Sequence, residues 1–263
     1  MAKYGLIGGK LGHSFSKGIH EMYFSAIGEE SAYELIEVSE EDIEKTLMSF
    51  SREGYSGINV TIPHKKEVIK YLDEISPEAK SIGAVNTIKF SGGKMIGYNT
   101  DYYGFGKTLE KGGIEIQGKN VYILGTGGAS YAVSAYCREM KAKVTFVSRT
   151  PSDNAIGYDE FEKTATDGIL VNCTPVGMYP NTDATPTEHI KCFDAVVDII
   201  YNPLKTKLME LAEGCGIKAV NGLYMLVAQA ICAQGVWHGT EFDEDIIDKI
   251  YVKIKEQMEG NKL

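Results

Sequence analysis

Three polar side chains stand at the end of a predicted buried strand, where they could hold a small ligand. In the segment Gly57–Lys65, Asn59 and Thr61 alternate with β-branched residues and therefore share one face of the strand. Lys65 follows just past its carboxyl end, the edge at which open α/β sheets bind ligands. An amide, a hydroxyl and an ammonium there could bind a small polyol or acid, and the ammonium could transfer a proton. The alternative interpretation is an ordinary polar turn with a surface lysine.

Other polar residues mark the starts of predicted helices. Ser14 and Ser16 flank the first helix, where either serine could be the N-cap. With free N–H groups at the helix N-terminus, the two hydroxyls could instead bind an anion such as a carboxylate. Asp101 precedes a predicted helix over 102–111, and an N-cap is its simplest role.

Strands and helices alternate in the first half of the chain. Strands are predicted over 3–9, 32–38 and 57–62 with helices between them, which indicates a parallel sheet with right-handed crossovers. Pro63 is expected to end the third strand and to begin a helix with four apolar residues at helical spacing, Val68, Ile69, Leu72 and Ile75. A hairpin follows over 84–98, with Asn86 early in its first arm.

Four motifs in this half resemble the substrate half of the shikimate dehydrogenase family. They are Ser14-x-Ser16, Asn59-Val60-Thr61-Ile62-Pro63-x-Lys65, Gly83-Ala84-Val85-Asn86-Thr87 and Asn99-Thr100-Asp101. The resemblance implies that Ser14 and Ser16 bind a substrate carboxylate, and that hydroxyls are bound by Asn59, Thr61, Asn86 and Asp101. It implies that Lys65 is catalytic, and we interpret Lys65 as the acid/base with Asp101 orienting it. The implied reaction is the reversible, NADPH-dependent reduction of 3-dehydroshikimate to shikimate.

A glycine-rich turn lies between a strand and a helix in the second half. The strand 120–124 runs into Gly125-Thr126-Gly127-Gly128-Ala129, and a helix follows. This is the context of a dinucleotide fingerprint, in which the turn approaches the pyrophosphate and the helix N-terminus binds it. Ser130 stands where the fingerprint has its third glycine. We expect the five turn residues to contact a dinucleotide.

The strand after this helix favours NADP over NAD. The strand 143–147 ends in Ser148-Arg149-Thr150, where an NAD enzyme would place an acid for the ribose hydroxyl. A guanidinium can pair with a 2′-phosphate instead, and Ser148 and Thr150 flank it. Asp153 has the wrong charge for that partner, so NADP selectivity could be incomplete.

The family resemblance extends over the remaining segments. It implies cofactor contacts for four residues, Thr174, Ile199, Gly222 and Met225, and substrate contacts for two, Tyr201 and Gln229. The expected fold is α/β with two domains and a cleft between them. An open α/β substrate domain, residues 1–101 completed by C-terminal helices over 223–263, would hold an inserted Rossmann-type NADP-binding domain over 102–222.

Composition excludes several other classes of protein. The net charge of −9 argues against a nucleic-acid partner. The apolar run 223–237 is interrupted by glutamines and a glycine, which favours a buried helix over a membrane span. Five cysteines without CxxC pairs indicate free thiols in the cytoplasm, and the histidines lack metal-ligand spacing, so no metal is expected. The chain is expected to be a monomer or homodimer.

Two alternatives to shikimate dehydrogenase activity remain open at this stage. One is a quinate or dual quinate/shikimate dehydrogenase that uses NAD or both cofactors. The other is a non-catalytic sensor of a shikimate-pathway ligand. Retention of Lys65, Asp101 and the glycine-rich turn favours an enzyme, because a sensor needs neither proton nor hydride chemistry.

Overall fold

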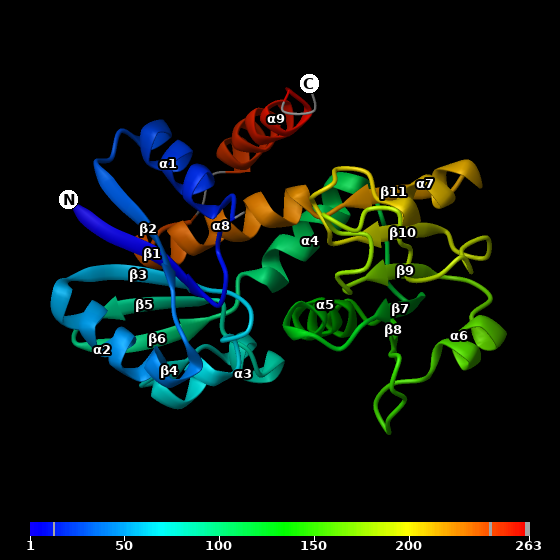
Figure 1. The fold of residues 1–263 in the computed structure, drawn as a ribbon, viewed down its shortest axis with the longest axis horizontal. Coiled ribbons are helices and arrows are strands. Elements are labelled where there is room, and N and C mark those ends of the chain that lie inside the picture. The colour runs from blue at the N-terminus through cyan, green and yellow to red at the C-terminus, as the bar shows by residue number, and fades with distance from the viewer. Residues whose placement is uncertain (13, 242–243, 261–263) are drawn as a thin grey trace. The chain divides into compact units, whose positions relative to one another are not determined.

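The chain folds into two compact α/β units (Figure 1). The computed structural model describes residues 1–12, 14–241 and 244–260. Unit 1 comprises Met1–Tyr103 and Val227–Leu263, and unit 2 comprises Gly104–Leu226. The chain passes from one unit to the other within two helices, α4 (Asp101–Gly112) and α8 (Leu223–His238). The predicted α/β fold with two sheets, one of them a parallel Rossmann-type sheet, is confirmed.

Unit 1 contains a mixed six-stranded sheet in the order β2-β1-β3-β5-β6-β4. Its strands are β1 (Ala2–Gly8), β2 (Ser31–Glu37), β3 (Tyr55–Val60), β4 (Glu74–Ile75), β5 (Thr87–Ser91) and β6 (Lys94–Tyr98). Strands β1, β2 and β3 are parallel, as predicted. Strands β5 and β6 form the predicted hairpin through Gly92 and Gly93, and β5 is antiparallel to β3.

Helices cover both faces of the β1–β3 part of this sheet (Figure 1). The helices of unit 1 are α1 (Ser16–Ile27), α2 (Ile43–Glu53), α3 (Pro77–Ile82), α8 and α9 (Glu244–Gly260), with a 3-10 turn η1 (Glu40–Asp42) before α2. Helix α3 lies beside β6, and α9 packs on α1. Apolar residues of α2, such as Leu47, pack in one core with Ile58 and Val60 of β3. On the opposite face, Trp237 of α8 lies against Gly57. The alternating faces of β3 therefore pack against different helices.

The helix predicted after Pro63 is wrong. Strand β3 ends at Val60, and the side chain of Ile62 is 73% exposed. A short 3-10 helix, η2 (Glu67–Tyr71), follows, and Leu72 then adopts an extended backbone (φ −93°, ψ 141°). The N–H of Asp73 donates to the carbonyl of Met95 at 3.0 Å, which leads the chain into β4 beside β6. Pairing with the sheet therefore replaces the helix that the apolar spacing indicated.

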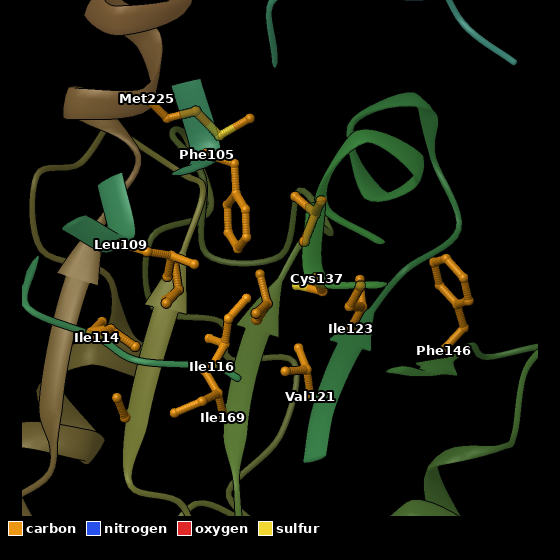
Figure 2. Close-up of a cluster of buried hydrophobic side chains, with 14 of the residues drawn as sticks. Phe105, Leu109, Ile114, Ile116, Val121, Ile123, Cys137, Phe146, Ile169 and Met225 are labelled. Carbon is orange, nitrogen blue, oxygen red and sulfur yellow. The ribbon is translucent and has the colours of Figure 1, made fainter. Parts of the chain in front are cut away.

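Unit 2 is a doubly wound parallel sheet in the order β11-β10-β9-β7-β8. Its strands are β7 (Asn120–Leu124), β8 (Lys143–Val147), β9 (Ile169–Asn172), β10 (Ala195–Asp198) and β11 (Lys218–Asn221). One core joins α4 and α5 (Gly128–Glu139) to one face, with Phe105 and Leu109 over Val121 and Ile123 (Figure 2). A second core joins α6 (Tyr158–Thr164) and α7 (Lys207–Gly214) to the other face. The carboxyl ends of all five strands therefore share one edge.

Within the described residues, no helix is long and apolar enough to cross a bilayer. All five cysteines are free thiols. The same residues contain no group of three or more histidine, cysteine or acidic side chains placed to hold a metal ion.

Candidate active site

Lys65 and Asp101 form a largely buried ion pair in unit 1. The Lys65 Nζ donates to Asp101 Oδ2 at 2.5 Å, and the two side chains are only 14% and 9% exposed. Lys65 lies in the turn after β3, and Asp101 is the first residue of α4. The N–H of Asp101 donates to Asn99 Oδ1 at 3.1 Å, so the loop before α4 holds the backbone that carries the carboxylate.

The side chain of Asn86 connects this ion pair to the sheet. Its Nδ2 donates to Asp101 Oδ1 at 2.9 Å and to Thr100 Oγ1 at 3.0 Å. Its Oδ1 accepts from the Thr100 N–H at 2.7 Å and from Thr87 Oγ1 at 3.0 Å. The Asn86 carbonyl accepts from the Val60 N–H at 2.8 Å, which anchors this segment to the end of β3. Donors and acceptors on both sides therefore fix the orientation of the amide.

The network continues through Asn59 to strand β2. Asn59 Nδ2 donates to Thr87 Oγ1 at 3.0 Å, and Tyr33 Oη donates to Asn59 Oδ1 at 2.8 Å. Six side chains thus form a continuous hydrogen-bonded series, which we call the polar chain: Tyr33, Asn59, Thr87, Asn86, Asp101 and Lys65. These six side chains are largely buried. Breaking one link therefore leaves a buried polar atom unpaired, at a cost of about 1–3 kcal/mol.

Burial fixes the protonation states at the β2 end of the polar chain. It raises the pKa of Tyr33 well above its ordinary value of 10.0, so the phenol stays a donor to Asn59. The ring of His20 stacks on Tyr33 with centroids 4.1 Å apart. Burial lowers the pKa of His20 to about 3, against a weaker opposing hydrogen bond with Asn59, so this imidazole is neutral. The β2 end is therefore uncharged, and the charge is confined to the Lys65–Asp101 pair.

The other predicted substrate residues of unit 1 lie on three segments. Ser14 Oγ accepts from the Ser16 N–H at 3.3 Å, and neither serine caps α1, whose N-cap position is Phe15. The N–H of Thr61 donates to the Ile7 carbonyl at 2.9 Å. Gln229 Oε1 lies 3.5 Å from Asn86 Nδ2, which brings α8 to the polar chain. Ser14 lies before α1 and Ser16 is its first residue, and none of the hydrogen bonds found among the described residues joins either serine to the polar chain.

The glycine-rich turn of unit 2 fits a dinucleotide phosphate. Gly125 has φ +98°, and a Cβ there would lie 3.0 Å from Thr174 Cγ2, so only glycine lets the turn lie against Thr174. A Cβ on Gly127 would meet none of the described atoms within 4 Å. Gly127 is the N-cap of α5, and no described side chain caps this N-terminus. Open space beside uncapped N–H groups is the arrangement that binds phosphates.

Ser130 takes the place of the third glycine without disturbing this turn. It is fully buried, and its Oγ donates to the Gly127 carbonyl at 2.6 Å. Thr126, Gly128 and Ala129 complete the turn and the first residues of α5.

The residues predicted to select NADP follow β8 directly. Arg149 is exposed, and it takes part in none of the ion pairs found among residues 1–12, 14–241 and 244–260. The Thr150 N–H donates to Ser148 Oγ at 3.2 Å, which curves the chain around the arginine. Asp153 is also exposed, in a tight turn closed by Ser152 and Ala155. An exposed guanidinium at this edge is available to a 2′-phosphate.

The other predicted contacts of unit 2 follow β9, β10 and β11. Gly222 lies so close to Ile199 that a Cβ would overlap the Ile199 carbonyl. Tyr201 is partly buried, and burial raises the pKa of its phenol, so it stays protonated. Met225 belongs to the core between α4 and the sheet, where Figure 2 shows its side chain above Phe105.

Comparison with known proteins identifies the family. The shikimate dehydrogenase substrate binding domain matches residues 6–88. A shikimate dehydrogenase (NADP(+)) of Clostridium perfringens strain SM101 is 42% identical, over 97% of this chain and 99% of its own length. This chain belongs to the shikimate dehydrogenase family. The family resemblance drawn from the four motifs is therefore confirmed.

Solved structures agree with this membership of the shikimate dehydrogenase family. A chorismate mutase/shikimate 5-dehydrogenase fusion protein from Clostridium acetobutylicum has a TM-score of 0.95 at 42% identity, covering 98% of this chain and 99% of that one. Shikimate 5-dehydrogenase from Thermus thermophilus, in complex with NADP(H) and shikimate, has a TM-score of 0.86 at 32% identity, covering 96% and 99%.

Sequence reasoning assigned no individual role to several residues that organise these two sites. In unit 1 they are Tyr33 and Thr87, and in unit 2 they are Asn172, Asp198 and Thr206. Asp198 carried a signal, because an acid inside the apolar run 195–200 is seldom buried without partners. Tyr33 carried none, because a tyrosine in a strand is ordinary.

Proposed function

We propose that this chain is an NADP-dependent oxidoreductase of the shikimate dehydrogenase family that reversibly reduces the 3-keto group of 3-dehydroshikimate to shikimate. The observation that carries the proposal is the Lys65–Asp101 pair, 2.5 Å long and largely buried at the end of the polar chain. Support comes from the Clostridium perfringens relative, named for NADP(+), and from the Thermus thermophilus structure, which contains NADP(H) and shikimate.

In this proposal the small-molecule substrate binds through residues of known chemistry. The Ser14 and Ser16 hydroxyls donate to its carboxylate. Its ring hydroxyls are bound by amide, hydroxyl and charged side chains. These belong to Asn59, Thr61, Lys65, Asn86, Asp101, Tyr201 and Gln229. Because the amides of Asn59 and Asn86 are held by their neighbours, their orientation is set before substrate arrives, which reduces the entropy lost on binding.

The residues of unit 2 would hold NADP. The backbone of Gly125, Thr126, Gly127, Gly128 and Ala129 would bind the phosphates, and Ser148, Arg149 and Thr150 the 2′-phosphate. Thr174, Ile199, Gly222 and Met225 would lie beside the nicotinamide half. When bound, NADPH supplies the hydride, and the protein supplies orientation and the proton.

Lys65 is the proposed proton donor. Reduction of a ketone develops negative charge on its oxygen, and an ammonium hydrogen-bonded to that oxygen stabilises the charge and then gives up a proton. Asp101 accepts one Nζ–H of Lys65, which restricts the rotation of the ammonium and directs its other protons. In the reverse direction neutral Lys65 accepts the proton of the substrate hydroxyl.

Replacement of Lys65 by alanine tests this assignment. General acid–base help is worth about 10²–10⁴-fold, so Lys65→Ala should lower kcat by at least about 10²-fold with a smaller change in KM. Lys94→Ala is the matched control, because Lys94 pairs with Glu74 at the same 2.5 Å but is exposed on unit 1. Unchanged kcat in Lys65→Ala, with Lys94→Ala also normal, would remove Lys65 from the mechanism.

The substrate and cofactor are tested with four mixtures. Purified protein is incubated with shikimate or quinate, each with NADP or NAD, and nicotinamide absorbance is followed. Turnover of shikimate with NADP is expected. Turnover of quinate with NAD would favour a quinate dehydrogenase instead. No change in absorbance in any of the four mixtures would favour a ligand sensor. A cytoplasmic location and a monomeric or homodimeric state stay predictions.

A further inference from the structure

The carboxylate of Asp198 is fully buried at the carboxyl end of β10, and three donors surround it. Its Oδ1 accepts from Asn172 Nδ2 at 3.0 Å and from the Ile200 N–H at 3.1 Å. Its Oδ2 accepts from Thr206 Oγ1 at 2.7 Å. None of these donors carries a positive charge, so the carboxylate is held by hydrogen bonds and not by an ion pair.

One of these donors connects Asp198 to the segment that follows β9. Asn172 Oδ1 accepts from the Thr174 N–H at 3.0 Å and from Thr174 Oγ1 at 2.7 Å. Thr174 in turn lies against the turn at Gly125, where a Cβ would come within 3.0 Å of its methyl group. Asp198 therefore fixes, through Asn172, a wall of the glycine-rich turn.

The other two donors fix the segment that follows β10. The Ile200 N–H that binds Asp198 leads directly to Tyr201, and the Ile200 carbonyl accepts from the Gly222 N–H at 2.9 Å. Thr206 is the N-cap of α7, so its hydroxyl ties the far end of the same loop to the carboxylate. The ends of β9, β10 and β11 are thus joined around one buried acid.

We propose that Asp198 is a positioning residue for the dinucleotide: it holds the segments after β9 and β10 in the arrangement that receives the nicotinamide half. The inference rests on the proposed function. Ligands of parallel sheets bind at the carboxyl edge, and these segments form that edge in unit 2. A buried carboxylate is costly, and an apolar residue would suit the sheet interior better if packing were its only task.

The pKa of Asp198 reflects this burial. Burial raises its pKa to about 6, and the hydrogen bonds from Thr206, Ile200 and Asn172 oppose that shift. Perturbed acids of this type cluster at functional sites.

The test separates positioning from stability with a matched pair of variants. Asn172→Ala cuts the link between Asp198 and Thr174 and leaves the carboxylate two donors. Asn120→Ala is the control, because Asn120 at the amino end of β7 also donates to an aspartate, Asp167, but at the opposite edge of the same sheet. NADPH binding is followed by nicotinamide fluorescence, together with KM for NADP, kcat and thermal unfolding.

Asn172→Ala should weaken NADPH binding and lower kcat/KM for NADP by at least about tenfold, since misplacement by about 1 Å can cost about 10²-fold. Asn120→Ala should change neither. Asp198→Asn can accept from Asn172 and Ile200 and donate to Thr206, so it should bind NADPH at least about tenfold more tightly than Asp198→Ala. If Asp198→Ala does not fold, the comparison of NADPH binding by Asn172→Ala and Asn120→Ala tests the proposal by itself.

Normal NADPH affinity in Asn172→Ala, with only a lower unfolding temperature, would overturn the proposal. Failure of the proposed function has a different signature, in which the wild-type protein binds NADPH but does not oxidise shikimate. The binding measurement on the variants remains decisive in that case, because it does not depend on turnover.

Discussion

Replacement of Gly57 by alanine should destabilise unit 1 through a single collision. Gly57 lies in the middle of β3, and a Cβ built on it would overlap the indole ring of Trp237 in α8. Trp237 is only 6% exposed, and two contacts hold its indole in place. The ring stacks on Tyr4 with centroids 4.8 Å apart, and its Nε1 donates to the Ile88 carbonyl at 3.0 Å. The ring therefore cannot yield without breaking other contacts.

The expected loss follows from two costs. Adding a methyl group to a filled core typically costs about 1–3 kcal/mol. If the indole moves, its N–H and the Ile88 carbonyl lose their hydrogen bond, and an unpaired buried group costs about 1–3 kcal/mol. The free energy of unfolding should fall by about 2–6 kcal/mol, a large share of a typical total of about 5–15 kcal/mol.

The assay uses the fluorescence of Trp237, which is the only tryptophan in the chain. Urea unfolding should give a lower midpoint for Gly57→Ala, and the native emission should change because the indole has moved. Gly18→Ala is the control: Gly18 lies in α1, a Cβ there would meet none of the described atoms within 4 Å, and alanine in a helix should stabilise by about 0.5–1 kcal/mol.

The outcome that would refute this reasoning is specific. Wild-type stability and unchanged emission in Gly57→Ala would mean that α8 does not pack on β3 through a glycine-sized gap. A fall in stability with unchanged emission would show that the cost arises elsewhere than at the indole.

Three further predictions concern the polar groups. Tyr33→Phe should raise KM for shikimate at least about threefold, since it removes the hydroxyl that donates to Asn59 Oδ1. Tyr55→Phe removes a hydroxyl bound to a glutamate outside the polar chain and should leave KM unchanged. Burial raises the pKa of Asp198 from 3.8 to about 6, so between these values the folded chain binds more protons than the unfolded chain. Urea titrations should therefore show wild-type stability falling relative to Asp198→Asn as the pH rises from about 4 to about 6; the opposite slope would exclude burial as the dominant cause. Arg149→Gln should raise KM for NADP about tenfold and leave KM for NAD nearly unchanged, as steady-state kinetics with both cofactors would reveal; an equal effect on both would contradict a 2′-phosphate contact.

Local patterns in the sequence predicted most of the elements. The strands β7 and β8 have the predicted bounds, because a short apolar run followed by glycine or a polar turn leaves few alternatives. The failure over 63–75 has a physical cause. Its apolar spacing satisfies a helix, but hydrogen bonds to β6 compete for the same backbone, and that competition is invisible in a local window.

The sequence by itself determined which residue types are available at the carboxyl ends of the strands, because motif spacing and strand periodicity are local properties of the chain. Tertiary structure alone decided how those side chains are held. Tyr33 on β2 bonds Asn59 on β3, although β1 lies between the two strands, so this contact depends on the strand order. Asp198 likewise gains a donor from Asn172 on β9. Such contacts join residues far apart in sequence, and their formation depends on packing of the whole sheet.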